Sequence, residues 1–80
     1  MTQNIYWCQE KGEWGGLFVI ATTRGKAKQI FANEVECRFI DVLTSIMRRG
    51  VNETFSCVID DSGSPLLKKY NLEYQEEEEW

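Results

Sequence analysis

One stretch constrains the fold of this chain more than any other, the five consecutive apolar residues Leu17–Ala21 that follow a glycine pair. A run of this length and kind is typical of a strand that is buried on both of its faces. Thr22 or Thr23 comes next, and either hydroxyl can cap a helix by accepting a hydrogen bond from a free amide of its first turn. The chain is therefore expected to fold around a strand, a helix cap and a helix in direct succession.

The segments on either side of this strand predict a hairpin and a helix. Ile5–Cys8 is rich in β-forming residues, and the polar, glycine-containing stretch 9–16 after it predicts a hairpin with residues 17–21. The helix is expected from about Arg24 to Glu34. Its inward face, which would cover the hairpin, carries Ala27, Ile30, Phe31 and Val35.

Residues 37–48 fit both the helical and the strand period. On a helix, one face would carry Phe39, Val42, Leu43, Ile46 and Met47. On a strand, one face would carry Ile40, Val42, Thr44 and Ile46. A glycine at position 50, just beyond an arginine pair, is typical of a helix end, whereas the density of β-branched residues favours a strand. We predict a helix that ends near Ile46, with the strand as the alternative.

The C-terminal third of the chain predicts one more strand and one more helix. Phe55–Ile59 alternates toward a short strand, and residues 60–63 have the composition of a turn. Ser64 and Pro65 are suited to begin a short helix, whose inward side chains would be Leu66, Leu67 and Tyr70.

The end of this short helix completes the expected domain. Asn71 can end it in the left-handed conformation, which lets Leu72 fold back onto the last turn. Together the elements predict a single α+β domain over residues 1–74, an N-terminal antiparallel β-hairpin packed by a helix and followed by further short elements. Residues 75–80 are expected to form an acidic tail.

The charge of the chain is unevenly distributed. The net charge is −4, yet residues 1–70 hold nine basic and eight acidic side chains, whereas residues 71–80 hold five glutamates and no base. A run of like charges repels itself and is expected to stay solvated. The alternative is an acidic strip that binds a basic partner or imitates a phosphate backbone, formed by Glu76, Glu77, Glu78 and Glu79 with Trp80 as its apolar anchor.

The size and the cysteine content of the chain bear on its oligomeric state and on its cellular compartment. A domain of 80 residues buries only about 60% of the surface that its unfolded chain exposes, so a homodimer would add stability. Three cysteines without a Cys-x-x-Cys pair favour a reducing cytoplasm. No apolar run approaches the roughly 20 residues of a spanning helix, and the N-terminus lacks the basic start of a signal peptide, so we expect a cytoplasmic protein with no membrane partner.

The side-chain inventory restricts the chemistry. The chain has no histidine, which removes the commonest general base and the commonest metal ligand. Cys8, Cys37 and Cys57 lack the paired spacing of zinc ligands and are expected to be small buried apolar residues. We therefore predict that the protein is not an enzyme and holds no metal and no cofactor.

Three basic residues lie at the start of the expected helix, where positive charge is electrostatically unfavourable. Arg24, Lys26 and Lys28 crowd the first turns of the expected helix, where the positive end of the helix dipole disfavours positive charge. An anion at this helix start, either a phosphate or the carboxylates of a partner, would relieve that repulsion, and Arg48 and Arg49 could extend the site. The alternative is ordinary surface charge with no fixed ligand.

Several motifs spread over the chain also carry a resemblance. They are Tyr6, Trp7 and Cys8, the glycine pair before the central strand, the stretch 23–28 with Phe31, Phe39 with Val42 and Leu43, the stretch 48–50, and the stretch 66–70. Together they resemble the small uncharacterised open reading frames of bacteriophages and of conjugative mobile elements of bacteria. The resemblance implies a bacterial cytoplasm and a mobile-element origin, and it implies no catalytic residue.

These observations predict a non-enzymatic accessory protein that binds a protein partner, either through the basic helix start or through the acidic end. One alternative is nucleic-acid binding, in which the basic residues contact phosphates and the affinity falls steeply with salt. Another is inhibition by acidic mimicry of DNA, as in some phage-encoded inhibitors.

Overall fold

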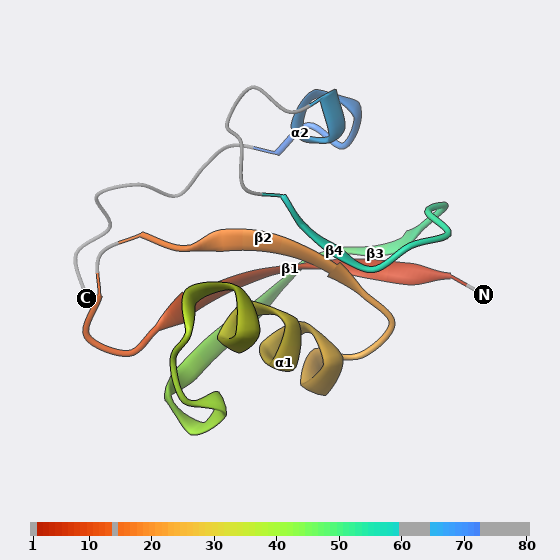
Figure 1. Cartoon of the computed structure of the whole chain (residues 1–80). Coiled ribbons are helices and arrows are strands. Elements are labelled where there is room, and N and C mark those ends of the chain that lie inside the picture. The colour runs from red at the N-terminus through yellow and green to blue at the C-terminus, as the bar shows by residue number, and fades with distance from the viewer. Residues whose placement is uncertain (1, 14, 60–64, 73–80) are drawn as a thin grey trace.

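The strands of the protein form one antiparallel sheet that lies between two helices (Figure 1). The structure is a computed structural model and describes residues 2–13, 15–59 and 65–72. In chain order its elements are β1 (Gln3–Glu10), β2 (Leu17–Ala21), α1 (Arg24–Val35), the short 3-10 helix η1 (Phe39–Asp41), β3 (Val42–Val51), β4 (Cys57–Ile59) and α2 (Pro65–Lys69). The strand order is β3-β1-β2-β4, which confirms the predicted α+β class. The predicted turn at 60–63 and the predicted tail at 75–80 lie outside the described residues.

The hairpin of β1 and β2 is the centre of the sheet, as the sequence predicts. Its pairing runs from Asn4 opposite Ala21 to Cys8 opposite Leu17. Side chains alternate between the two faces of a strand, so β2 directs Phe18 and Ile20 to the face that α2 covers and its intervening residues to the face that α1 covers. Residues 18–21 are all fully buried, which is why this run is continuously apolar.

A glycine is required where the hairpin closes. A Cβ atom at position 16 would lie 2.0 Å from the backbone oxygen of Cys8, far inside any permitted contact. Gly15 beside it has a φ of 70°, in the left-handed region that glycine adopts without strain. The glycine pair that precedes the apolar run therefore serves the close approach of the two strands.

Helix α1 begins and packs largely as predicted. The hydroxyl of Thr23 accepts a hydrogen bond from the backbone N–H of Lys26 at 3.1 Å and so caps the helix. Ala27 and Phe31 are buried against the sheet. Val35, predicted to face inward as well, is 38% exposed because it lines an open pocket at the end of the hairpin.

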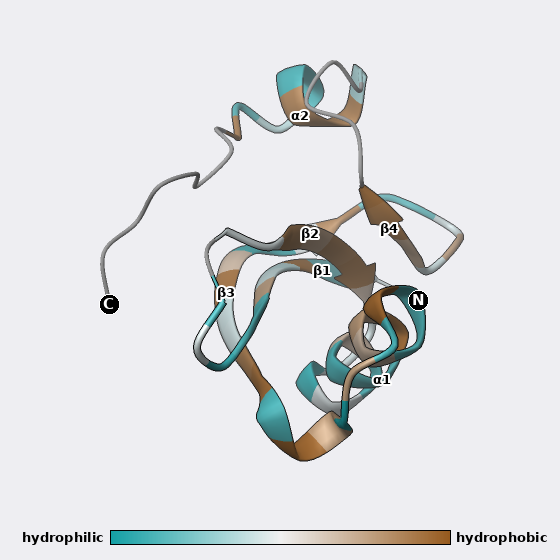
Figure 2. Cartoon of the chain, turned by 60° about the vertical axis from the view of Figure 1, so that its left-hand side comes forward, coloured by the Kyte–Doolittle hydropathy of each residue, from teal (hydrophilic) through white to brown (hydrophobic). Residues whose placement is uncertain are grey.

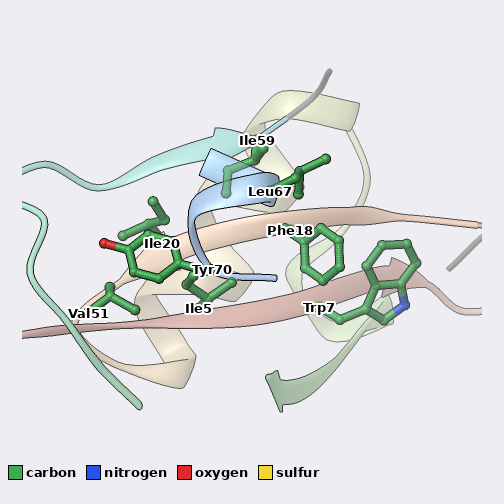
Figure 3. Close-up of a cluster of buried hydrophobic side chains, with 8 residues drawn as sticks. All are labelled: Ile5, Trp7, Phe18, Ile20, Val51, Ile59, Leu67 and Tyr70. Atoms are coloured by element: carbon green, nitrogen blue, oxygen red, sulfur yellow. The ribbon is translucent and has the colours of Figure 1, made fainter. Parts of the chain in front are cut away.

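The core has two layers, one on each face of the sheet. The cluster beneath α2 consists of Ile5, Trp7, Phe18, Ile20, Val51, Ile59, Leu67 and Tyr70 (Figure 3). The cluster beneath α1 consists of Tyr6, Cys8, Val19, Ala21, Ala27, Phe31, Ala32 and Val42. Colouring by hydropathy shows the apolar ribbon of β2 between these two layers (Figure 2). Neither face of the central hairpin is left open.

The prediction of a helix over residues 37–48 is wrong. This segment contains the short turn η1 and then the ten-residue strand β3, which was the alternative interpretation. Strand β3 pairs with β1 from Val42 opposite Glu10 to Ile46 opposite Tyr6, and its register then shifts twice before Val51. The hydrogen bonds of this pairing come from a strand more than thirty residues earlier in the chain, so the local period could not decide between helix and strand.

The C-terminal elements follow the prediction closely. Leu67 and Tyr70 are buried, and Asn71 has a φ of 57°, in the left-handed region. The N–H of Leu72 donates to the oxygen of Leu67 at 2.8 Å, which folds the chain back onto α2. Strand β4 begins at Cys57, later than the predicted start, because residues 52–56 form a loop.

Candidate binding site at the outer edge of strand β3

Strand β3 is an edge strand, and half of its backbone groups point away from the sheet. The N–H of Lys11 donates to the oxygen of Asp41 at 2.8 Å, which marks these two residues as a hydrogen-bonded pair. Because such pairs alternate along an antiparallel ladder, Leu43 and Ser45 bond to β1, whereas the backbone groups of Thr44 and Ile46 point outward. Among the described residues, no strand lies on this outer side.

Apolar side chains are exposed along the same edge. Leu43 is 48% exposed and Met47 is 39% exposed, although both belong to the strand. The turn before the strand adds Phe39 at 43% and Ile40 at 77%. These four side chains and the outward backbone groups form what we call the β3 edge. An edge of this kind is a template for pairing with another extended chain.

Arg24 reaches across from the start of α1 to this edge. Its Nη1 donates to the backbone oxygen of Thr44 at 3.1 Å and to the Thr44 hydroxyl at 3.0 Å. The Thr44 oxygen is one of the outward-pointing acceptors, so an added strand can bond to it only after Arg24 releases it. Charged side chains at an edge strand disfavour nonspecific pairing with the strands of other chains.

Lys28 lies one helical turn further along α1 and also faces the β3 edge. Its Nζ lies 4.9 Å from the centre of the Phe39 ring. Arg24 and Lys28 are four residues apart and therefore share one side of the helix. Both place positive charge beside the edge, on the face of the sheet that α1 covers.

The remaining predicted cations are distributed over both sides of the sheet. The guanidinium of Arg48 lies 5.6 Å from the centre of the Tyr70 ring, on the face that α2 covers. Arg49 is exposed near the end of β3, and Lys26 is exposed in the first turn of α1. The five cations therefore do not form one cradle at the helix start, and only Arg24 and Lys28 contact the β3 edge from α1. Sequence reasoning could have found this arrangement only through the strand alternative for residues 37–48.

The acidic residue nearest this edge is already engaged. Asp41 accepts a hydrogen bond from Nε of Arg38 at 3.0 Å, and this contact raises the pKa of the arginine. Residues 2–13, 15–59 and 65–72 together carry nine basic side chains and six acidic ones. The positive charge at the β3 edge therefore comes from Arg24 and Lys28, which contact it directly.

A second polar cluster attaches α2 to the sheet. The Glu53 carboxylate is only 9% exposed and accepts hydrogen bonds from Nζ of Lys69 at 2.8 Å and from the Tyr70 hydroxyl. These bonds lower the pKa of Glu53 and raise the pKa values of Lys69 and Tyr70. Gln3 holds the same loop, because its Nε2 donates to the backbone oxygen of Glu53 at 2.9 Å.

A pocket of about 430 Å³ lies at the end of the hairpin. Its walls are Glu10, Glu13, Gly15, Gly16, Leu17, Phe31 and Val35. Its lining combines two acidic side chains with three apolar ones, and it shares no residue with the β3 edge.

The cysteines and the N-terminal aromatic residues contribute to packing. Burial raises the pKa of the Cys8 thiol to about 12, and that of Cys37 is raised as well, opposite to the shift of an activated nucleophile. Tyr6 and Trp7 are each only 4% exposed, so neither is available to stack on a nucleic-acid base. Trp14 lies outside the described residues.

Comparisons with known proteins add no family to this description, because no family model, no curated protein and no solved structure matched the chain. Within residues 2–13, 15–59 and 65–72, no helix has the length and apolar character that a membrane crossing requires. The same part of the chain contains no group of three or more His, Cys, Asp or Glu side chains that could hold a metal ion.

Proposed function

We propose that this chain is a non-enzymatic accessory protein that binds an extended segment of a partner protein along the β3 edge. One observation carries the proposal: β3 directs the backbone groups of Thr44 and Ile46 outward beside the exposed side chains Leu43 and Met47. An extended peptide added to such an edge gains main-chain hydrogen bonds for affinity and side-chain contacts for specificity.

The covered faces of the sheet support the edge as the route of binding. Helix α1 lies on one face and α2 on the other, so a partner reaches the sheet most directly from its side (Figure 1). The opposite edge strand, β4, has three residues, whereas β3 has ten. A longer edge offers more hydrogen bonds to an added strand. The resemblance to open reading frames of phages and conjugative elements supports placing this activity in the cytoplasm of bacteria.

The proposal is tested by blocking the edge without disturbing the sheet. Thr44→Pro removes an N–H that points away from β1, so the ladder between β1 and β3 is kept, and proline is tolerated on edge strands. Peptides of about ten residues, the length of a long strand, are selected for binding to the wild-type chain from a displayed random library. We expect Thr44→Pro to weaken the selected peptides about tenfold or more, because a hydrogen bond is lost and the ring obstructs the edge.

The matched control is Thr44→Val, which also loses the hydroxyl that Arg24 contacts but keeps the N–H. This variant should bind the selected peptides nearly as the wild type does. Circular dichroism and thermal unfolding verify that both variants fold. Peptides that bind the folded Thr44→Pro chain at full affinity would place the binding site elsewhere.

A further inference from the structure

We infer that the segment taken up by the β3 edge is acidic, with carboxylate side chains alternating with apolar ones. This inference rests on the proposed function and specifies the chemistry of its partner. It follows from what an added strand would meet on its two faces. Successive side chains of a strand point to opposite faces, so one set would meet α1 and the other would not.

The face toward α1 presents positive charge to an added strand. Arg24 stands at the outward oxygen of Thr44, and Lys28 stands over the Phe39 ring. Within residues 2–13, 15–59 and 65–72, Arg24 forms no ion pair, and its hydrogen bonds go to neutral oxygens. A carboxylate on the added strand would give it a charge-assisted hydrogen bond, which is stronger than a bond to a neutral acceptor.

The opposite face presents apolar side chains to the same strand. Leu43 pairs with Gln9, whose side chain is buried, so the Leu43 side chain lies on the face that α2 covers. It is nevertheless 48% exposed. Apolar side chains at alternate positions of the added strand would cover Leu43 and Met47. The added strand that fits this edge therefore has acidic side chains on the face toward α1 and apolar side chains on the opposite face.

A second copy of this chain fits the edge poorly. If two β3 strands paired antiparallel around their middle, the Arg24 side chains of the two copies would lie close together, because each stands at the outward oxygen of Thr44. The two Lys28 side chains would add positive charge on the same face. Like charges placed together in this way oppose association. The same cations that attract an acidic segment thus disfavour the copy, and specificity arises from both effects.

The test uses three blocked synthetic peptides of about ten residues, a typical strand length. The first alternates glutamate and valine, the second alternates lysine and valine, and the third has the composition of the first with all glutamates preceding all valines. Binding to the full chain is measured by isothermal titration calorimetry at about 50 mM and about 500 mM salt. We expect the first peptide to bind, with an affinity that falls as salt rises, and the other two to bind at least about tenfold more weakly.

A charge reversal at the edge separates local recognition from net charge. Lys28→Glu should weaken the first peptide about five- to tenfold, because it replaces an attractive contact by a repulsive one. Lys68→Glu is the matched control, since it changes the net charge equally on exposed helix α2. Equal losses in the two variants, or equal binding of the lysine and glutamate peptides, would overturn the inference.

The remaining outcomes separate this inference from the proposed function. If library peptides are lost in Thr44→Pro but are not acidic, the edge binds a partner and the inferred chemistry is wrong. If sedimentation instead shows a dimer that Thr44→Pro dissociates, the occupant is a second copy and the inference is likewise overturned. If the selected peptides bind Thr44→Pro with the same affinity as the wild type, both the proposed function and the inference are wrong.

Discussion

At the scale of single residues, the carboxylate of Glu53 forms contacts that depend on pH. It is almost completely buried, and it is held by Lys69 and by the hydroxyl of Tyr70. A buried carboxylate is tolerated in a fold only when charged or hydrogen-bonding partners compensate for the loss of water. Sequence patterns gave no indication of this cluster, because its members come from a loop and a helix far apart in the chain.

The pH dependence of stability follows from the pKa shifts in this cluster. The pKa of Glu53 is lower in the folded chain than its ordinary value of 4.5, so the carboxylate contributes stability above pH 4.5 that is lost as the pH falls through the folded value. The pKa of Tyr70 lies above its ordinary value of 10.0, so its contribution is present below pH 10.0 and is lost as the pH rises through the folded value.

We therefore expect Glu53→Gln to destabilise the chain most between pH 4.5 and pH 10.0. The free energy of unfolding is measured with denaturant at a series of pH values for both proteins. Their difference should shrink toward the acid end, because the wild-type carboxylate is protonated there. A difference that stays constant across the range would show that the charge of Glu53 does not hold α2.

At the scale of elements, helix α1 and strand β3 show where sequence periodicity succeeds and where it fails. The apolar positions of α1 recur only at the helical spacing, and the cap at Thr23 is local, so the helix could be predicted from the sequence. The apolar positions of β3 fit both spacings. Pairing with β1 decided the outcome, because a long-range ladder overrides weak local preference.

Helix α2 is short, and its attachment through Leu67 can be tested by mutation. Leu67 is 5% exposed and packs among the side chains of the cluster beneath α2. Leu67→Ala should lower the free energy of unfolding by about 2–4 kcal/mol, since it removes buried apolar surface and leaves a cavity. Chemical denaturation measures this change.

Lys68→Ala is the control on the same helix. Because Lys68 is exposed, its loss should change the free energy of unfolding by less than about 0.5 kcal/mol. Similar effects of the two substitutions would mean that α2 does not contribute to the core.

At the scale of the whole molecule, we expect the central hairpin to be the part that opens last. It is covered on both faces, and Cys8 within it is fully buried, with its thiol 3.9 Å from the backbone oxygen of Ala27. Each outer strand pairs with only one strand of the hairpin, and α2 covers only one of its faces. This arrangement makes Cys8 a reporter of global unfolding.

We expect a thiol reagent to label Cys8 far more slowly than Cys37 in the native protein. Cys8 is inaccessible and its pKa of about 12 leaves almost no reactive thiolate, whereas Cys37 is partly exposed. Labelling followed by peptide mass spectrometry gives both rates. The Cys8 rate should rise with denaturant along the global unfolding curve, and fast labelling without denaturant would show that β1 opens locally.

Three local elements could be predicted from the sequence: the hairpin around Leu17–Ala21, helix α1 with its cap, and helix α2 with its left-handed end at Asn71. Each depends on residues within a few positions of one another, through periodicity, capping or a glycine conformation. The tertiary structure alone decided that residues 42–51 are a strand, that this strand lies at an edge, and that Arg24 and Lys28 stand beside it. These features depend on which distant segment supplies the hydrogen bonds of β3, and a local pattern of burial does not specify that partner.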